Sequence, residues 1–371
     1  MKIKTITCHD VYNYGASLQA YALQKYLINQ GHDVEIINYK PDYLNRTYNF
    51  WYVPQSSKWY TYTKRNSFFH LLYAIRYIRG NFGTWRRKAP FDKFTKNILK
   101  CTRRFKSYQE LVTYAPESQC YIAGSDQIWN CAMQNGHDPA FYLDFGAKDA
   151  IRLSYAASLA VKSIPENHKP FLLKQLAKFQ AISVRESSGK AILDDLNVKS
   201  EVVCDPVYLL SKNEWEDFAG RVPLIKKRYL LVYHLYLDHF DLEMRARELA
   251  KLYNLEIVSV NDQHEIDYAT INISYAGPIE FVNLFKYAEF VVTDSFHGTS
   301  FSIILNKNFY AYYSTKKSGI SRLVDLLSAI GIPERLNSST INLENIDWCN
   351  VNKRLNTFVQ NGKNFLKNHI G

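Results

Sequence analysis

Residues 291–299 carry the clearest signal for chemistry: an apolar run ends in Thr-Asp-Ser and is followed by Phe, His, Gly and Thr. The run predicts a buried strand and residues 298–305 predict a helix, so Ser295, His297 and Gly298 would lie where a strand end meets a helix N-terminus. Backbone amides there bind anions, and an imidazole can donate a proton. A second interpretation stays open, in which Asp294 and Ser295 merely cap the helix and His297 is structural.

Residues 124–130 read Gly-Ser-Asp-Gln-Ile-Trp-Asn and follow the apolar residues 120–123, so polar groups again crowd a predicted strand end. Asp126 could serve as a base toward a sugar hydroxyl, and Trp129 could stack on a sugar face. Ser125 and Gln127 would then contact the same acceptor. The alternative is a turn with an Asx cap and a core tryptophan.

Cationic residues follow two other predicted strands. Arg185 ends the short apolar run 181–184 and could grip a carboxylate or phosphate, although an ion pair with Glu186 explains it equally well. Asp205, before Pro206, is interpreted as a structural cap. After the predicted strand 309–313, three cations could reach an anion near His297 or could be plain solvated charge: Lys316, Lys317 and Arg322.

The first predicted strand-to-helix turn holds His9, Asn13, Tyr14 and Gly15. Its helix N-terminus could hold a phosphate or a sugar. A Gly-closed turn with an Asn cap needs no ligand and is the alternative.

Strands and helices alternate in both halves of the chain, which predicts an α/β fold with two Rossmann-like domains facing across a cleft. We expect a first domain over residues 1–175 and a second over 176–350. Residues 351–371 predict a basic amphipathic helix that packs back on the first domain.

The net charge of +11 belongs to one segment of the 371-residue chain. Residues 46–106, which read as an insertion, hold fifteen Lys and Arg against one acid, and the other 310 residues sum to −3. Within it, an apolar stripe over residues 68–78 either lies on an anionic membrane or packs on the domain. Binding of single-stranded nucleic acid is a rival use, but no nucleic-acid motif supports it, so we expect no such partner.

Several classes of protein are excluded by pattern. There is no 18-residue apolar run and no secretory leader, which predicts a cytoplasmic protein, with peripheral contact at the inner face of the membrane as an option. The six cysteines lack Cys-x-x-Cys spacing, and there is no His-Glu metal cluster, Walker A loop or GxGxxG fingerprint. We expect neither a metal nor a bound cofactor.

Taken together, residues 13–20, 124–130, 183–186, 205–206 and 293–299 resemble, in this order, the motifs of the polysaccharide pyruvyl transferase family. The resemblance implies a GT-B-like pair of domains and a transferase that moves pyruvate from phosphoenolpyruvate onto a glycan as a ketal. Phosphoenolpyruvate is then a co-substrate, and the acceptor is a sugar of a cell-surface polysaccharide or its lipid- or nucleotide-linked precursor.

The resemblance also implies roles for particular residues. Arg185 and His297 match positions that hold phosphoenolpyruvate, and a third cation of the family does not align, so Lys317 and Arg322 are both candidates. The alternative function is a GT-B glycosyltransferase that uses a nucleotide-sugar.

Overall fold

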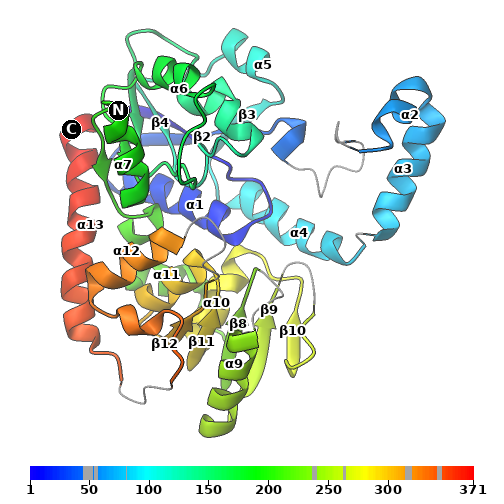
Figure 1. Cartoon of the computed structure of the whole chain (residues 1–371), viewed down its shortest axis with the longest axis vertical. Helices are drawn as coiled ribbons and strands as arrows, with labels where there is room; N and C mark the ends of the chain where they lie inside the picture. Colours follow the sequence, from blue (N-terminus) through cyan, green and yellow to red (C-terminus); the bar gives the residue numbers. More distant parts are fainter. Residues whose placement is uncertain are drawn as a thin grey trace.

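The computed structural model describes residues 1–44, 53, 57–80, 82–235, 240–261, 265–313, 320–340 and 345–371. Two five-stranded parallel sheets form its centre (Figure 1). The helices are α1 (Tyr14–Asn29), α2 (Tyr60–Arg65), α3 (Ser67–Gly80), α4 (Phe82–Asn97), α5 (Tyr108–Thr113), α6 (Lys169–Leu176), α7 (Ser187–Asp195), α8 (Lys212–Ala219), α9 (Phe240–Tyr253), α10 (Pro278–Tyr287), α11 (Phe296–Ile304), α12 (Ile320–Ile330) and α13 (Trp348–Ile370). Short 3-10 turns are η2 (Gln134–His137), η3 (Pro139–Tyr142), η4 (Pro206–Leu209) and η5 (Pro333–Arg335).

The first sheet has the strand order β3-β2-β1-β4-β5. Its strands are β1 (Lys2–Ile6), β2 (Asp33–Tyr39), β3 (Cys101–Phe105), β4 (Cys120–Ala123) and β5 (Ile151–Ser154). The chain order reverses between β1 and β4, and ligands of such folds bind beyond the carboxyl ends of the strands at that point. The loops after these two strands are residues 7–13 and 124–130, which carry two of the motifs singled out above.

The second sheet repeats the topology, in the order β10-β9-β8-β11-β12. Its strands are β8 (Tyr229–Tyr233), β9 (Glu256–Val260), β10 (Ile271–Ile273), β11 (Phe290–Thr293) and β12 (Asn308–Ala311). The reversal falls between β8 and β11, so the loop after β11, with Ser295 and His297, lies at the corresponding point. Two Rossmann-like domains are therefore confirmed, each with its switch point lined by motif residues.

Two short parallel strands, β6 (Ser183–Val184) and β7 (Glu201–Val202), follow the first sheet in the chain. Parallel bridges join Leu153 to Ala181 and Ala157 to Val184, so β6 runs beside β5 and continues the first sheet. We therefore place the domain boundary between β7 and β8, later in the chain than residue 175.

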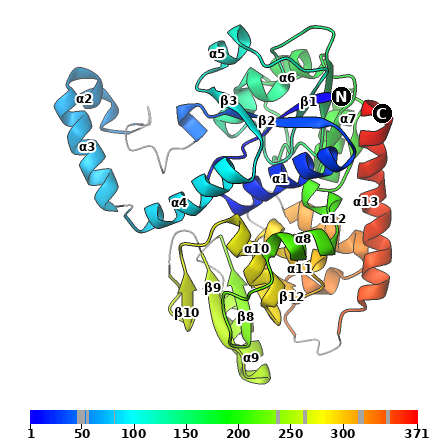
Figure 2. The ribbon, with the colours of Figure 1, turned by 180° about the vertical axis from the view of Figure 1, so that it is seen from behind.

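Aromatic packing joins the two domains. The ring of Tyr14, in α1, stacks on Phe281 of α10 at 4.2 Å, and its hydroxyl donates to the carbonyl of Ala276 at 2.9 Å. Helix α13 runs along both domains (Figure 2) and packs on α12. A Cβ at its Gly362 would lie 2.4 Å from the Tyr155 hydroxyl, so a side chain there would push the helix away from the first domain.

Helices α2 and α3 form a hairpin that projects from the two domains, and α4 leads the chain back to them (Figures 1 and 2). We call residues 57–80 the arm. It lies within the basic segment 46–106, of which residues 46–52, 54–56 and 81 lie outside the described residues.

Candidate active site between the domains

A cavity of about 600 Å³ lies between the two switch points. Its first-domain wall includes Asn13, Asp126 and Gln127. Ser295, His297 and Arg322 come from the second domain. Motifs that lie far apart in the sequence thus face one space.

His297 lies in the first turn of α11, because the helix begins at Phe296, two residues earlier than the sequence predicted. The Ser295 side chain caps this helix by accepting from the amide of Gly298 at 3.4 Å. A Cβ at Gly15 would lie 2.0 Å from His297 Nδ1, so only glycine leaves room for the ring there. The N-termini of α1 and α11 therefore meet at His297, and both helix dipoles favour an anion beside it.

A buried cluster of charges lies behind the cavity wall. Arg185 Nη1 donates to Asp205 Oδ2 at 2.7 Å, and His297 Nε2 lies 3.6 Å from the same oxygen. Arg185 Nη2 also lies 3.5 Å from Asp126 Oδ1. Asp205 thus connects the two residues that the family resemblance assigns to the donor, although the sequence suggested only a structural cap for it. Its side chain does cap η4 as well, through the amide of Val207.

The electrostatics of this cluster favour ionised side chains. Burial alone would raise the pKa of Asp205, but the nearby His297 and the charged, hydrogen-bonded Arg185 lower that pKa well below its ordinary value. Burial would lower the pKa of Arg185, but the carboxylates of Asp205 and Asp126 raise it overall. Both groups are held charged while almost wholly shielded from water.

Asp126 projects into the cavity from a turn that begins with a cis peptide bond between Gly124 and Ser125. Its φ is +68°, and its backbone carbonyl accepts from the amide of Ser158. A Cβ at Gly124 would lie 2.2 Å from the carbonyl oxygen of Tyr155, the residue after β5, so only glycine fits at this position of the turn. With its side chain 22% exposed, Asp126 is accessible to a ligand.

Four residues that the sequence predicted to contact the acceptor have buried side chains in this structure. Trp129 is fully buried, stacks on Tyr142 and donates from its indole N–H to the carbonyl of Phe141. Tyr14 is used in the packing between domains. Ser125 and His9 are also buried, at 0% exposure, and contact backbone carbonyls.

Arg322 is the cation after β12 that the structure places at the cavity. Its guanidinium lies 5.5 Å from the ring centroid of Phe296, and that of Arg185 lies 5.1 Å from the same centroid. Burial lowers the pKa of Arg322, and the charge of Arg185 lowers it further. Lys316 and Lys317 lie outside the described residues.

The sequence reasoning missed part of the cavity wall. Tyr233, Asp294 and Tyr313 line it, and Asp294 Oδ1 also accepts from the amide of Leu235 at 2.6 Å. Asp294 directly follows the buried strand β11, and Tyr233 is the last residue of the buried strand β8. Both could therefore have been found, like His297, as polar residues at the end of a predicted strand.

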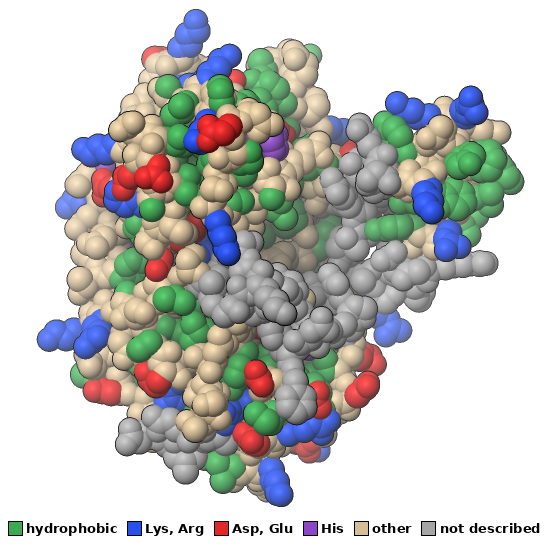
Figure 3. Space-filling model, in the orientation of Figure 1, with side chains coloured by type: hydrophobic (Ala, Val, Ile, Leu, Met, Phe, Trp, Pro, Cys, Tyr) green, Lys and Arg blue, Asp and Glu red, His purple; other side chains and the backbone are tan. Residues whose placement is uncertain are grey.

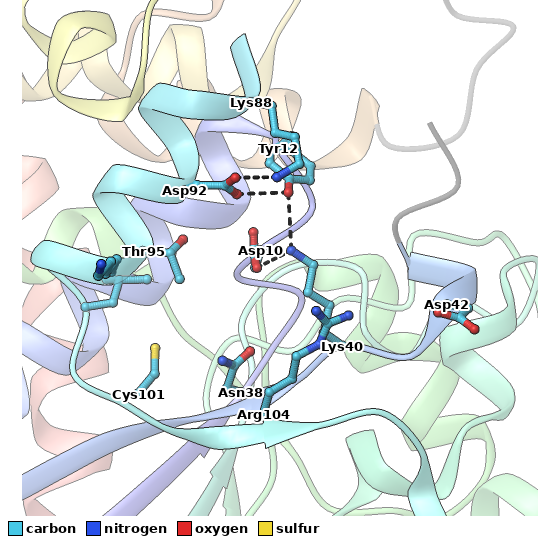
Figure 4. Close-up of a pocket in the computed structure, with 12 residues that line it drawn as sticks. Asp10, Tyr12, Asn38, Lys40, Asp42, Lys88, Asp92, Thr95, Cys101 and Arg104 are labelled. Atoms are coloured by element: carbon cyan, nitrogen blue, oxygen red, sulfur yellow. Dashed lines mark hydrogen bonds and ion pairs between the residues drawn. The ribbon is translucent and has the colours of Figure 1, made fainter. Parts of the chain in front are cut away.

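A second cavity, of about 690 Å³, lies on the other side of the loop after β1 (Figure 4). Lys40 points to Asp10 there, and the carboxylate of Asp92 lies between Lys88 and the hydroxyl of Tyr12. These two lysines are paired with carboxylates of the protein, and Lys96 and Arg104 line the same cavity.

The topology and the site define an α/β protein of GT-B-like architecture with a charged cavity between its domains. The chain belongs to the polysaccharide pyruvyl transferase family, whose model matches residues 13–315, and it is therefore a transferase of polysaccharide biosynthesis by family. No curated protein matches it.

Three solved structures resemble the chain at low identity. S. aureus MnaA with UDP is 12% identical, with 98% of this chain and 91% of that chain covered and a TM-score of 0.45. The UDP-GlcNAc 2-epimerase from Neisseria meningitidis bound to UDP-GlcNAc is 10% identical, with coverages of 99% and 93% and a TM-score of 0.44. The E. coli ADP-heptose LPS heptosyltransferase II is 10% identical, with coverages of 98% and 100% and a TM-score of 0.39.

Among the described residues, no group of three or more His, Cys, Asp or Glu could hold a metal ion. In the same part of the chain, no helix is long and apolar enough to cross a membrane.

Proposed function

We propose that this protein transfers the pyruvate unit of phosphoenolpyruvate onto two hydroxyls of a glycan, forming a ketal and releasing phosphate. The observation that carries the proposal is the convergence of His297, Arg322 and two helix N-termini at one cavity, with Arg185 buried behind its wall. Phosphoenolpyruvate bears a carboxylate and a phosphate, and cations and helix N-termini stabilise both. Ser295 and Gly298, at the start of α11, complete the donor side.

His297 supplies the proton in this scheme. The His297 ring lies with Nε2 3.6 Å from Asp205 and Nδ1 against Gly15, and in our proposal it protonates the methylene carbon of phosphoenolpyruvate. The double bond breaks, and C2 becomes an oxocarbenium-like centre. Arg185 holds Asp205 in place and adds positive charge behind the donor.

The acceptor side consists of Asp126, with Asn13 and Gln127 beside it on the cavity wall. Asp126 takes the proton of a first sugar hydroxyl as its oxygen bonds to C2. The C2–O bond to phosphate then breaks, and a second hydroxyl closes the ketal. One hydroxyl proton restores His297 and the other leaves with phosphate, so the scheme needs no metal and no further cofactor.

The acceptor in this proposal is a sugar of a cell-surface polysaccharide, such as a capsule or exopolysaccharide, or of its lipid- or nucleotide-linked precursor. We place the reaction in the cytoplasm, at the inner face of its membrane. Peripheral contact of the basic segment with anionic lipid is part of that location.

The test is the release of phosphate from phosphoenolpyruvate in the presence of candidate glycans, with mass spectrometry of the acceptor. The product should gain the mass of one pyruvate less one water. His297→Ala should lose turnover by at least about a hundredfold, the typical contribution of general acid–base catalysis. His32→Ala, next to the amino end of β2, is the matched control and should keep wild-type turnover.

Wild-type turnover in His297→Ala would refute the role of His297. A thermal-shift comparison addresses the donor separately. Phosphoenolpyruvate should raise the melting temperature of the wild type, and Arg322→Ala should weaken that shift. Stabilisation by nucleotide-sugars without any by phosphoenolpyruvate would overturn the proposal and favour a glycosyltransferase.

A further inference from the structure

The outer face of the arm is apolar and exposed. Phe68, Leu72 and Ile75 follow one another at helical spacing on α3, and they are 58%, 39% and 41% exposed. Phe69 and Leu71 flank them and are also exposed. The sequence left open whether this stripe packs on a domain, and the structure leaves it facing solvent. Clusters of large apolar side chains on a surface mark interaction sites.

The opposite side of α3 shows that the hairpin has an interior of its own. The Tyr73 ring contacts that of Trp59 at 6.1 Å and stacks on Tyr77 at 5.8 Å, and Ala74 is buried. Tyr62 of α2 also contacts Phe69. The two helices therefore cover each other along one side, and the exposed stripe is the side that this packing leaves free.

The charge of the arm has a single sign. Residues 57–80 contain no Asp or Glu, and Lys58, Lys64, Arg65 and Arg76 are all exposed. Figure 3 shows blue cationic side chains next to green apolar ones on the projecting lobe. A partner for this surface must accept apolar side chains and carry negative charge around them.

We propose that the arm docks on an anionic lipid bilayer, with Phe68, Leu72 and Ile75 in the boundary between headgroups and acyl chains. An interfacial helix has this composition: aromatic and aliphatic residues on one face and Lys or Arg beside them. Anionic headgroups attract each nearby cation, and this attraction weakens with salt. The charge complementarity selects a bilayer over a second copy of the arm, since two arms would bring like charges together.

This proposal does not depend on the reaction. No residue of the arm lines the cavity between the domains, as far as the described residues define it. A failure of lipid binding would therefore leave the proposed chemistry standing, and the reverse also holds.

The experiment is co-sedimentation of the full chain with vesicles. The wild type should sediment with vesicles of phosphatidylglycerol and phosphatidylcholine in equal parts, and not with phosphatidylcholine alone. Raising the salt should release it. The triple variant Phe68→Ser, Leu72→Ser, Ile75→Ser should bind the anionic vesicles at least about tenfold more weakly, because it removes three of the five large apolar side chains that are exposed on α3 in the described residues.

A matched control removes three apolar side chains that are more exposed, on average, and lie outside the arm. Val222→Ser, Leu224→Ser, Leu252→Ser changes residues that are 77%, 48% and 53% exposed and should bind like the wild type. Equal binding of the arm variant and the wild type to anionic vesicles would overturn the proposal. A wild type that does not bind anionic vesicles would overturn it as well. Light scattering tests for the alternative partner, which is a second copy of the chain. A dimer that depends on the arm, together with no vesicle binding, would assign the surface to that second copy.

Discussion

Asp205→Asn removes one charge from the buried cluster while keeping the shape of the side chain. The wild-type carboxylate accepts from Arg185 at 2.7 Å and lies 3.6 Å from His297 Nε2, and it is fully buried. Asn can still accept from the amide of Val207, so the cap on η4 survives. What is lost is the compensation of the positive charge on Arg185.

The size of the effect follows from what remains around Arg185. Removing one partner of a buried ion pair costs about 3–5 kcal/mol, because the other charge stays buried without its counterpart. Asp126 at 3.5 Å and Glu186 at 4.0 Å remain as partial partners, so we expect the low end, about 3 kcal/mol. Asp194→Asn is the matched control: it breaks an exposed pair with Lys190, worth about 0–1 kcal/mol.

Urea unfolding followed by tryptophan fluorescence measures the difference. With an m-value of about 3 kcal/mol/M, Asp205→Asn should lower the midpoint by about 1 M. Asp194→Asn should lower it by about 0.3 M or less. Equal midpoints for the two variants would show that the ion pair between Asp205 and Arg185 does not stabilise the fold more than an exposed pair does, and would refute this prediction.

The pH dependence of this difference has a defined sign. The pKa of Asp205 in the folded protein is below its value in the unfolded chain, where aspartate titrates near about 3.9. A group with a depressed pKa contributes stability above its unfolded pKa and loses that contribution as the pH falls through the folded pKa. The gap between wild type and Asp205→Asn should therefore be constant from neutral pH down to about 5 and narrow only below about 4.

Two further substitutions separate chemistry from packing. Gly15→Ala places a Cβ 2.0 Å from His297 Nδ1 and should reduce phosphate release from phosphoenolpyruvate at least about tenfold, with the far-ultraviolet circular dichroism unchanged; an unaffected rate would show that this nitrogen is not used. Trp129→Phe should lower the free energy of unfolding by about 2 kcal/mol through the lost bond to Phe141 and the lost volume, while the acceptor KM stays the same. A raised KM with unchanged stability would restore Trp129 as a sugar platform.

The sequence predicted the features that depend on local pattern. Apolar runs such as residues 291–293 and 120–123 form buried strands, and the polar residues after them lie at the switch points of two parallel sheets. Asp126 and His297 therefore reach the cavity as strand-end residues should. In a parallel sheet the carboxyl ends of the strands lie at the same edge. Polar residues that follow buried strands, although far apart in the sequence, therefore come together in space.

Local pattern could not decide which side chains of a motif face the cavity. Trp129 lies three residues after Asp126, yet it is buried in the core, where its indole N–H donates to the carbonyl of Phe141. Tyr14 follows the cap residue Asn13, but its ring is used against Phe281 of the other domain. Contacts between domains leave no periodic trace in the sequence, so no spacing rule could have found them.

The same contacts explain why the site needs both domains in one fixed arrangement. Gly15 belongs to the first domain and His297 to the second, and beside their contact the ring of Tyr14, the residue before Gly15, stacks on Phe281 of the second domain. Arg185, from the strand that extends the first sheet, lies beside Asp205, which in turn reaches His297 across the boundary. A hinge opening between the domains would separate Nδ1 from α1 and Nε2 from Asp205 at once. The aromatic packing at Tyr14 therefore positions His297, although Tyr14 itself lies outside the cavity wall.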